Sequence, residues 1–332
     1  ERKINDAILS TENQRPNAIN LWREIGELII KPIENKIGSI DTLFISPDSE
    51  LNRIPFAAIG SENKKLLVES KNLRLLTTGR ELIELNKIKS NNLERSLVVA
   101  NPKFDLTNKV VNEISNKINF GQQRSGVLSN QKWNELLGTA KEGKIISKFL
   151  NADLLMQENA TSIAIQKVNS PKILHIASHS YFIPNEEEKN PLLRSGIVLA
   201  GANNSNLNNS DDGYLTALEI TRLNWEGTEL VVISGCESGK GESQSGEGVF
   251  GLKRSISVAG ASSSLLSLWK VDDAGTARFM ESFYKKLIEG QSKADALKNT
   301  QQEFLNHPIP GLRHPYYWAA FQLSGDWKSL NK

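Results

Sequence analysis

The chain has 332 residues, 39% of them hydrophobic and 23% charged, which is the composition of a globular protein large enough for a substantial core. Forty basic against 38 acidic residues leave a net charge of +2, so bulk electrostatics indicates neither a nucleic-acid nor a membrane partner. A single cysteine excludes an internal disulfide, and no apolar stretch reaches about 18 residues, so we expect a cytoplasmic protein.

The first ninety residues mix helical and strand-like patterns. Apolar residues recur at helical spacing over 18–36, and strand-like runs follow at 41–49 and 73–79. The polar stretch 87–95 predicts a joint between two units, 1–90 and 91–332. Because a helical pattern starts shortly after Glu1, we also expect the chain to be a piece of a longer protein.

Beyond this joint, strands and helices alternate regularly. The predicted strands are continuous apolar runs, as in parallel sheets that helices cover on both faces, so the pattern predicts an α/β fold. The strands are expected at 96–102, 152–158, 172–178, 229–234, 262–271 and 317–325. The helices are expected at 134–150, 162–168, 215–223, 248–260, 273–289 and 293–306.

Two reactive side chains follow strands in this second unit. His179 comes after the strand 172–178, and Cys236 comes after the strand 229–234. Because parallel strands end at the same edge of a sheet, we expect Cys236 as a nucleophile beside His179 as its base. The alternative for Cys236 is a small buried apolar residue, which its polar and glycine neighbours disfavour. His175 lies inside an apolar strand and is expected to be a hydrogen-bonded core residue.

Metal and nucleotide sites are weaker alternatives. His175 and His179 lie four residues apart, which is ligand spacing on a helix and not on a strand. The glycine-rich stretch 239–253 lacks the residue order of a phosphate-binding loop. We therefore predict no metal and no cofactor, and a nucleotide-binding α/β protein remains an alternative that titration with ATP would test.

Several segments together resemble the CHAT domain, a caspase-like peptidase module related to separase and named for its association with TPR repeats and the cyanobacterial protein HetF. The segments are 173–182, 211–220, 229–287 and 314–327, and 28–76 resembles the inactive caspase-like half that precedes the catalytic half in that family. The resemblance implies a caspase-like three-layer α/β/α sandwich with a mostly parallel sheet.

The resemblance also assigns the reactive residues. The family's histidine falls on His179 and its cysteine on Cys236, although Ser180 stands where the family usually has glycine and "SGCES" where it commonly has "SACET". The backbone N–H groups of Cys236 and Ser180 are the expected donors to the oxyanion.

Substrate preference follows from an acidic pair. In separase-like relatives an aspartate after a Leu-Trp-x-Val segment recognises arginine at P1, and the matching positions here are Asp272 and Asp273. We expect one to cap the next helix and the other, Asp273, to bind the guanidinium. Glu247 is a further acidic candidate, and its alternative is a plain charge at a helix start.

The resemblance therefore implies a cysteine endopeptidase, a thiol protease that cleaves a protein substrate after a basic residue, with arginine preferred. The alternative is a catalytically silent caspase-like scaffold that acts through protein–protein interaction. The resemblance further implies a TPR-like region before Glu1 and a cyanobacterial source, and it leaves open whether a regulatory protein controls the activity.

Overall fold

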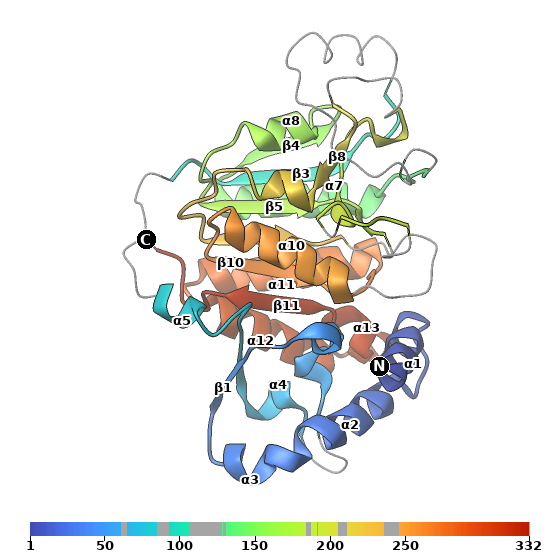
Figure 1. The fold of residues 1–332 in the computed structure, drawn as a ribbon, viewed down its shortest axis with the longest axis vertical. Helices are drawn as coiled ribbons and strands as arrows, with labels where there is room; N and C mark the ends of the chain where they lie inside the picture. Colours follow the sequence, from blue (N-terminus) through green and yellow to red (C-terminus); the bar gives the residue numbers. More distant parts are fainter. Residues whose placement is uncertain are drawn as a thin grey trace.

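Eight of the described strands form one continuous sheet (Figure 1). The structure is a computed structural model that describes residues 1–60, 65–84, 93–106, 128, 131–183, 187–190, 192–204, 211–235 and 246–331. In spatial order the strands are β1 (Thr42–Ile45), β2 (Asn72–Leu75), β11 (Phe321–Gly325), β10 (Ser263–Ser267), β9 (Leu230–Ile233), β5 (Ile173–Ala177), β3 (Leu97–Pro102) and β4 (Asp153–Gln157).

Neighbouring strands of this sheet run parallel, except β10 and β11, which are antiparallel. The strands β10, β9, β5, β3 and β4 therefore point one way, and β11, β2 and β1 point the other way. Because β5, β9 and β10 are parallel neighbours, their carboxyl ends lie at one edge of the sheet.

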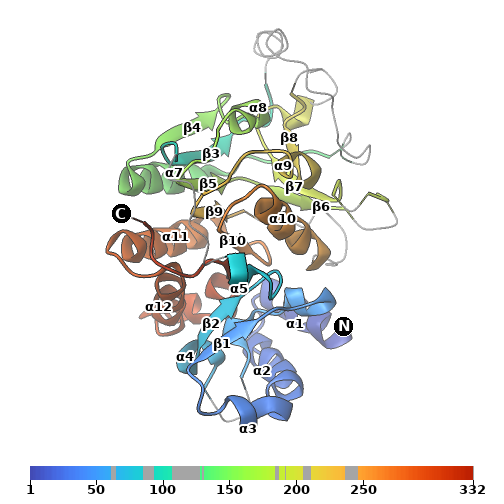
Figure 2. The same cartoon turned by 60° about the vertical axis from the view of Figure 1, so that its left-hand side comes forward.

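Helices cover both faces of the sheet (Figures 1 and 2). One core cluster contains α7 (Leu137–Leu150), α11 (Asp273–Ile288) and α12 (Lys293–Leu305). The other contains α8 (Ser162–Gln166), α9 (Ala217–Ile220) and α10 (Gly246–Val258). Alternate strand residues serve the two clusters, with Val232 in the first and Val231 in the second. This arrangement confirms the predicted three-layer α/β/α fold with a mostly parallel sheet.

The N-terminal elements pack against this framework. Trp22 stacks on Trp269 with ring centroids 6.3 Å apart, and β2 joins β11 through the pair Leu75 and Ser324. The elements are α1 (Arg2–Glu12), α2 (Ala18–Ile29), η1 (Lys31–Ile33), α3 (Glu34–Ile37), η2 (Ser49–Arg53), η3 (Phe56–Ala58), α4 (Leu67–Ser70) and α5 (Glu81–Glu84). The predicted boundary near residue 90 falls outside the described residues, and the division into 1–90 and 91–332 stays a prediction.

Several boundaries differ from the sequence-based expectations. The helix expected over 18–36 ends at Ile29, because Pro32 has no N–H to continue it and lies in a 3₁₀ turn. The strand expected from 317 begins at Phe321, because η6 (Pro310–Arg313) and α13 (Pro315–Trp318) precede it. Among the described helices, none has the length and apolarity that crossing a membrane requires.

A small antiparallel sheet was not expected from the sequence. It consists of β6 (Ser180–Phe182), β7 (Ser195–Val198) and β8 (Tyr214–Thr216), and the 3₁₀ turn η5 (Ala202–Asn204) lies between β7 and β8. Its first strand begins directly after His179. The small sheet therefore extends from the edge at which β5 ends.

His175 is a core residue, as predicted. Its side chain is fully buried in the middle of β5, with Nδ1 3.1 Å from the Tyr284 hydroxyl and Nε2 3.0 Å from Glu142 Oε1. Burial, and then the charge of Glu142, raise the pKa of Tyr284 well above its usual value, so the phenol keeps its proton. The cluster connects β5 to α7 and α11 beneath the sheet edge.

Lys253 links α10 to the N-terminal part of the chain. Its buried ammonium donates to the Leu76 carbonyl at 3.2 Å. Burial, partly offset by the charge of Glu81, lowers the pKa of Lys253 to about 8. The folded protein therefore disfavours the charged lysine, whereas the unfolded chain binds this proton up to about pH 10.5.

This burial predicts a pH-dependent effect of Lys253→Met. Below about pH 8 the native state carries the full cost of the charge, and that cost disappears as the pH rises through the window up to about pH 10.5. We expect Met to raise the free energy of unfolding by about 2 kcal/mol near pH 7, after allowance for the lost hydrogen bond, and by much less near pH 10. Melting curves of both proteins at the two pH values test this.

The exposed Lys285→Met on α11 is the matched control and should change stability little at either pH. A gain that is absent near pH 7, or that is equal at both pH values, would contradict the role assigned to the buried charge.

Candidate active site

The ends of β5 and β9 lie against each other. The two strands pair in register from Ile173 with Leu230 to Ile176 with Ile233. Beyond them the Ser180 hydroxyl donates to the Gly235 carbonyl at 2.8 Å.

The contact between these ends depends on glycine. A Cβ placed on Gly235 would lie 1.6 Å from the Ser178 carbonyl oxygen, so a larger residue could not be accommodated without moving the backbone. Cys236 itself lies outside the described residues, directly after this contact.

The imidazole of His179 contacts a main-chain carbonyl. Its Nε2 lies 2.8 Å from the backbone carbonyl of Asn134. Because a carbonyl only accepts hydrogen bonds, Nε2 carries the proton, and in the neutral ring Nδ1 is then the basic nitrogen. The rings of Phe104 and Trp133 each lie with their centres 5.2 Å from that of the imidazole. The side chain is therefore oriented by a main-chain acceptor and packed by aromatic neighbours.

Asn203 holds the segments that carry Phe104 and Trp133, the two aromatic neighbours of His179. Its side-chain amide accepts from the Trp133 N–H at 2.8 Å and donates to the Trp133 carbonyl at 3.0 Å. Its own backbone N–H donates to the Phe104 carbonyl. The indole N–H of Trp133 donates to the Tyr214 hydroxyl. One asparagine thus joins the two segments that flank His179.

A pocket of about 320 Å³, part of it open solvent, lies beside His179. Its lining comes from the ends of β5, β9 and β10 and from the starts of α7 and α11. The residues are Leu136, Thr139, Ser178, His179, Ser234, Gly235, Lys270, Val271, Asp273 and Thr276. A pocket therefore lies at the sheet edge where the sequence predicts the reactive residues, and His179 and Asp273 both line it.

The two aspartates have separate places in the structure, and the role of either in binding a basic side chain stays a prediction. Asp272 is the N-cap of α11 and accepts from the Gly275 N–H at 2.9 Å. Asp273 lines the pocket, and its Oδ2 accepts from the Gly138 N–H at 3.2 Å. A Cβ on Gly138 would lie 2.2 Å from that of Asp273, so glycine permits the approach. The carboxylate lies at the N-termini of α7 and α11, where helix dipoles favour negative charge.

The structure does not test the roles predicted for Ser180 and Glu247. Ser180 is buried at the start of β6, and the role of its N–H as an oxyanion donor stays a prediction. The side chain of Glu247 lies outside the described parts of the chain. Within the described residues, no three His, Cys, Asp or Glu side chains come together as metal ligands would.

A comparison with protein families identifies the chain. A family model described as the CHAT domain matches residues 20–326. The chain belongs to the CHAT domain family. This finding confirms the resemblance found in the sequence and makes the chain a caspase-like domain of the cysteine-peptidase type.

Two curated relatives also match most of the chain. Tetratricopeptide repeat protein 28 of Homo sapiens is 23% identical over 348 residues, and that of Mus musculus is 23% identical over 352. Each match covers 93% of this chain but 13% of the relative, so the chain spans a small part of those proteins.

Two solved structures also align with 94% of the chain, each with a TM-score of 0.47. They are the Arg-specific cysteine proteinase gingipain R, at 8% identity over 68% of that chain, and the complex of RgpB pro- and mature domains from Porphyromonas gingivalis, at 9% identity over 70%.

Several neighbours of His179 in this CHAT domain were missed from the sequence. The predicted helix 134–150 begins at Leu137, which leaves Asn134 in an extended segment whose carbonyl can face the imidazole. Asn203 lies in a stretch that looks like a polar loop, and Lys270 was included only as part of a strand. Their contacts join positions far apart in the sequence, so no local pattern marks them.

The two hydrogen bonds between the Asn203 side chain and the Trp133 backbone form a clamp that can be tested directly. Asn203→Ala removes two hydrogen bonds to the Trp133 backbone, each worth about 1 kcal/mol, so amide exchange over 131–136 should become faster by about tenfold or more. Hydrogen–deuterium exchange read by mass spectrometry measures this. The neighbouring Asn204→Ala, which loses the bond from the Leu106 N–H, should leave exchange over 131–136 unchanged. Equal effects of both variants would contradict the clamp.

Proposed function

We propose that this CHAT domain is a cysteine endopeptidase that cleaves a protein substrate after a basic residue, with arginine preferred. The observation that carries the proposal is the imidazole of His179, oriented by the Asn134 carbonyl beside the residue that precedes Cys236. The pocket next to it contains the carboxylate of Asp273. Such a reaction needs a base, a thiol and an anionic pocket, and the thiol of Cys236 follows Gly235 directly in the sequence.

In the proposed reaction, His179 Nδ1 takes the proton of the Cys236 thiol while Nε2–H stays on the Asn134 carbonyl. The thiolate attacks the carbonyl carbon of the scissile peptide, and the N–H groups of Cys236 and Ser180 stabilise the oxyanion. The imidazolium then gives its proton to the leaving amine, which leaves a thioester on Cys236. Water attacks this thioester with His179 again as base and releases the acid and the free thiol.

Asp273 supports the preference for a basic residue. A guanidinium in the pocket would form a charge-assisted pair with its carboxylate, whose position the Gly138 N–H maintains. Lys270 lines the same pocket as Asp273.

The setting of the activity is part of the proposal. The names of the curated relatives support a TPR-like region in the whole protein, which would bring substrates or a regulatory protein to the domain. A cytoplasmic location and a cyanobacterial source rest on the sequence arguments above. The alternative of a silent scaffold predicts binding to partners without any cleavage.

The dyad is tested by Cys236→Ala and His179→Ala. Because the two groups act as a unit, each variant should lose peptide-bond cleavage by about a hundredfold or more while remaining folded. Cys236→Ala should keep the melting temperature of the parent, whereas His179→Ala should lower it, because its buried ring packs against Phe104 and Trp133. An arginyl chloromethylketone should label the parent protein and fail to label Cys236→Ala.

The control is His175→Ala, which should lower the melting temperature because it removes a buried partner of Tyr284 and Glu142. Cleavage above a few per cent in either dyad variant would end the assignment.

The acidic pocket is tested by Asp273→Asn. We expect the rate on arginine substrates to fall by about a hundredfold or more, because a cation would enter a pocket without its carboxylate, while small electrophiles still alkylate Cys236. The matched control is Asp272→Asn, since asparagine caps helices about as well as aspartate and should leave cleavage nearly unchanged. If variants at 272, 273 and 247 all cleave after arginine at the parent rate, the basic preference is wrong.

A further inference from the structure

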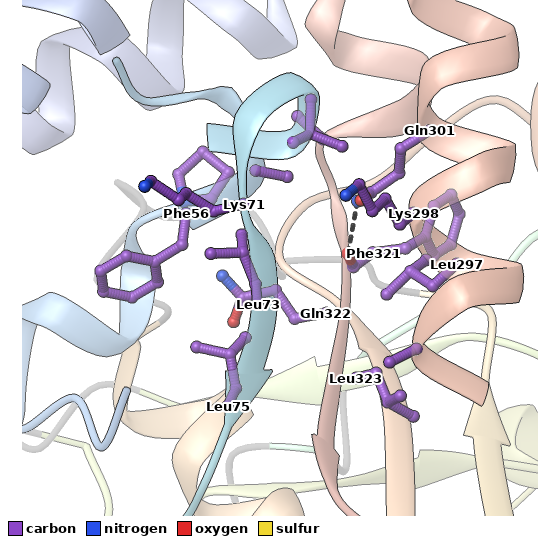
Figure 3. A pocket seen from close by; sticks show the side chains of 15 residues that line it. Phe56, Lys71, Leu73, Leu75, Leu297, Lys298, Gln301, Phe321, Gln322 and Leu323 are labelled. Carbon is purple, nitrogen blue, oxygen red and sulfur yellow. Dashed lines mark hydrogen bonds between the residues drawn. The ribbon is translucent and has the colours of Figure 1, made fainter. Parts of the chain in front are cut away.

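A second pocket lies far from His179, where β2 and β11 meet. Among the described residues these strands share a single residue pair, Leu75 with Ser324, and the pocket of about 480 Å³, counted with its open mouth, lies beside it. Figure 3 shows Leu73 and Leu75 of β2 across from Leu297 of α12 and Leu323 of β11. The lining residues are Pro55, Phe56, Ala57, Val68, Lys71, Leu73, Leu75, Ala294, Leu297, Lys298, Gln301, Ala319, Phe321, Gln322 and Leu323.

Most polar groups of this lining already have partners. The Lys71 ammonium donates to the carbonyls of Ile37, Gly38 and Ile40. The side-chain N–H of Gln322 donates to the Ile54 carbonyl. The walls are otherwise aliphatic or aromatic carbon, which an apolar ligand group would fill.

Two polar side chains of α12 have capacity left for a ligand. Lys298 and Gln301 lie three positions apart in the sequence, so they lie on one face of the helix. Gln301 is 4% exposed and donates to the Trp318 and Phe321 carbonyls, and its Oε1 accepts no hydrogen bond from the described residues. Lys298 has one hydrogen-bond partner among them, the neutral Oδ1 of Asn72 at 2.8 Å. Burial lowers the pKa of Lys298, and the charge of Asp295 partly offsets this.

This pair needs an acceptor for Lys298 and a donor for Gln301 Oε1. One residue of an extended peptide supplies both on the same side, since its C=O accepts and its N–H donates. A fatty-acid carboxylate would serve Lys298 and leave Gln301 without a donor, and an alkylammonium would do the reverse. We propose that this pocket binds an extended peptide segment of a partner protein, with an aliphatic side chain among the apolar residues, and with the C=O and N–H of one of its residues bonded to Lys298 and Gln301.

Such a segment would touch both parts of the chain, because Phe56 and Leu73 come from the first ninety residues and Leu297 from the second unit. The inference does not depend on the peptidase activity, since the pocket lies away from His179 and Asp273.

Methyl NMR of the full chain, titrated with N-acetyl-leucine N-methylamide, tests the proposal. We expect saturable shifts of the Leu73, Leu297 and Leu323 methyl signals at millimolar probe. Lys298→Met should weaken binding by about fivefold through loss of one hydrogen bond, and Ala294→Leu should abolish it by filling the pocket. The exposed Lys285→Met on α11 is the matched control and should bind like the parent. If Ala294→Leu does not fold, Lys298→Met still decides.

Three results would overturn the proposal. The first is an absence of shifts at these methyl groups, and the second is unchanged binding in Lys298→Met. The third is a wrong ligand preference, in which decanoate or N-acetyl-aspartate N-methylamide binds at these methyl groups and the leucine probe does not.

Discussion

The parallel pairing of β5 with β9 is the constraint on which the candidate site depends. It brings two chain segments, more than fifty residues apart in sequence, to one edge of the sheet. The close approach of Gly235 to the Ser178 carbonyl then fixes the relative position of the two chain segments that follow β5 and β9. Without a side chain at 235, the backbone that leads to Cys236 can touch the backbone that leads into His179. His179 thus follows the end of a rigid strand, which holds a side chain more accurately than a free loop does.

Around this edge, main-chain atoms hold the side chains of the two candidate site residues that the structure describes there. His179 is oriented by a backbone carbonyl, and Asp273 is held by a backbone N–H at the start of α7. Side chains contribute indirectly, as when Asn203 holds the Trp133 backbone next to that carbonyl. A backbone carbonyl or N–H remains when its residue is replaced by another. The positions of His179 and Asp273 therefore depend on how the segments that carry these backbone groups pack. This explains why glycines at 138 and 235 matter, since each allows two segments to come into contact.

The contact between the N-terminal part and the rest has a different character. The stacked rings of Trp22 and Trp269 join the two parts, and a hydrogen bond from Lys253 also crosses between them, whereas β2 and β11 share a single residue pair. Because β2 and β11 pair at one position only, the apolar side chains beside this position are not packed tightly against each other. The second pocket lies at this point, and its two incompletely satisfied polar groups lie on α12. A ligand there would act on the joint between the two parts.

The sequence alone determined the fold class and showed that His179 and Cys236 each follow a predicted strand. Those predictions depend on short-range patterns, namely continuous apolar runs and the polar residues that end them, and local physics is sufficient for both. Asp272 as a helix cap was also predictable, because capping involves the next three residues only. The tertiary structure alone decided that Asn134 faces His179, that Asn203 clamps Trp133, that Asp273 meets Gly138 and that the pocket at β2 and β11 exists. These contacts join residues from 45 to well over a hundred positions apart. Their partners are chosen by the packing of whole elements, which no local pattern of residues encodes.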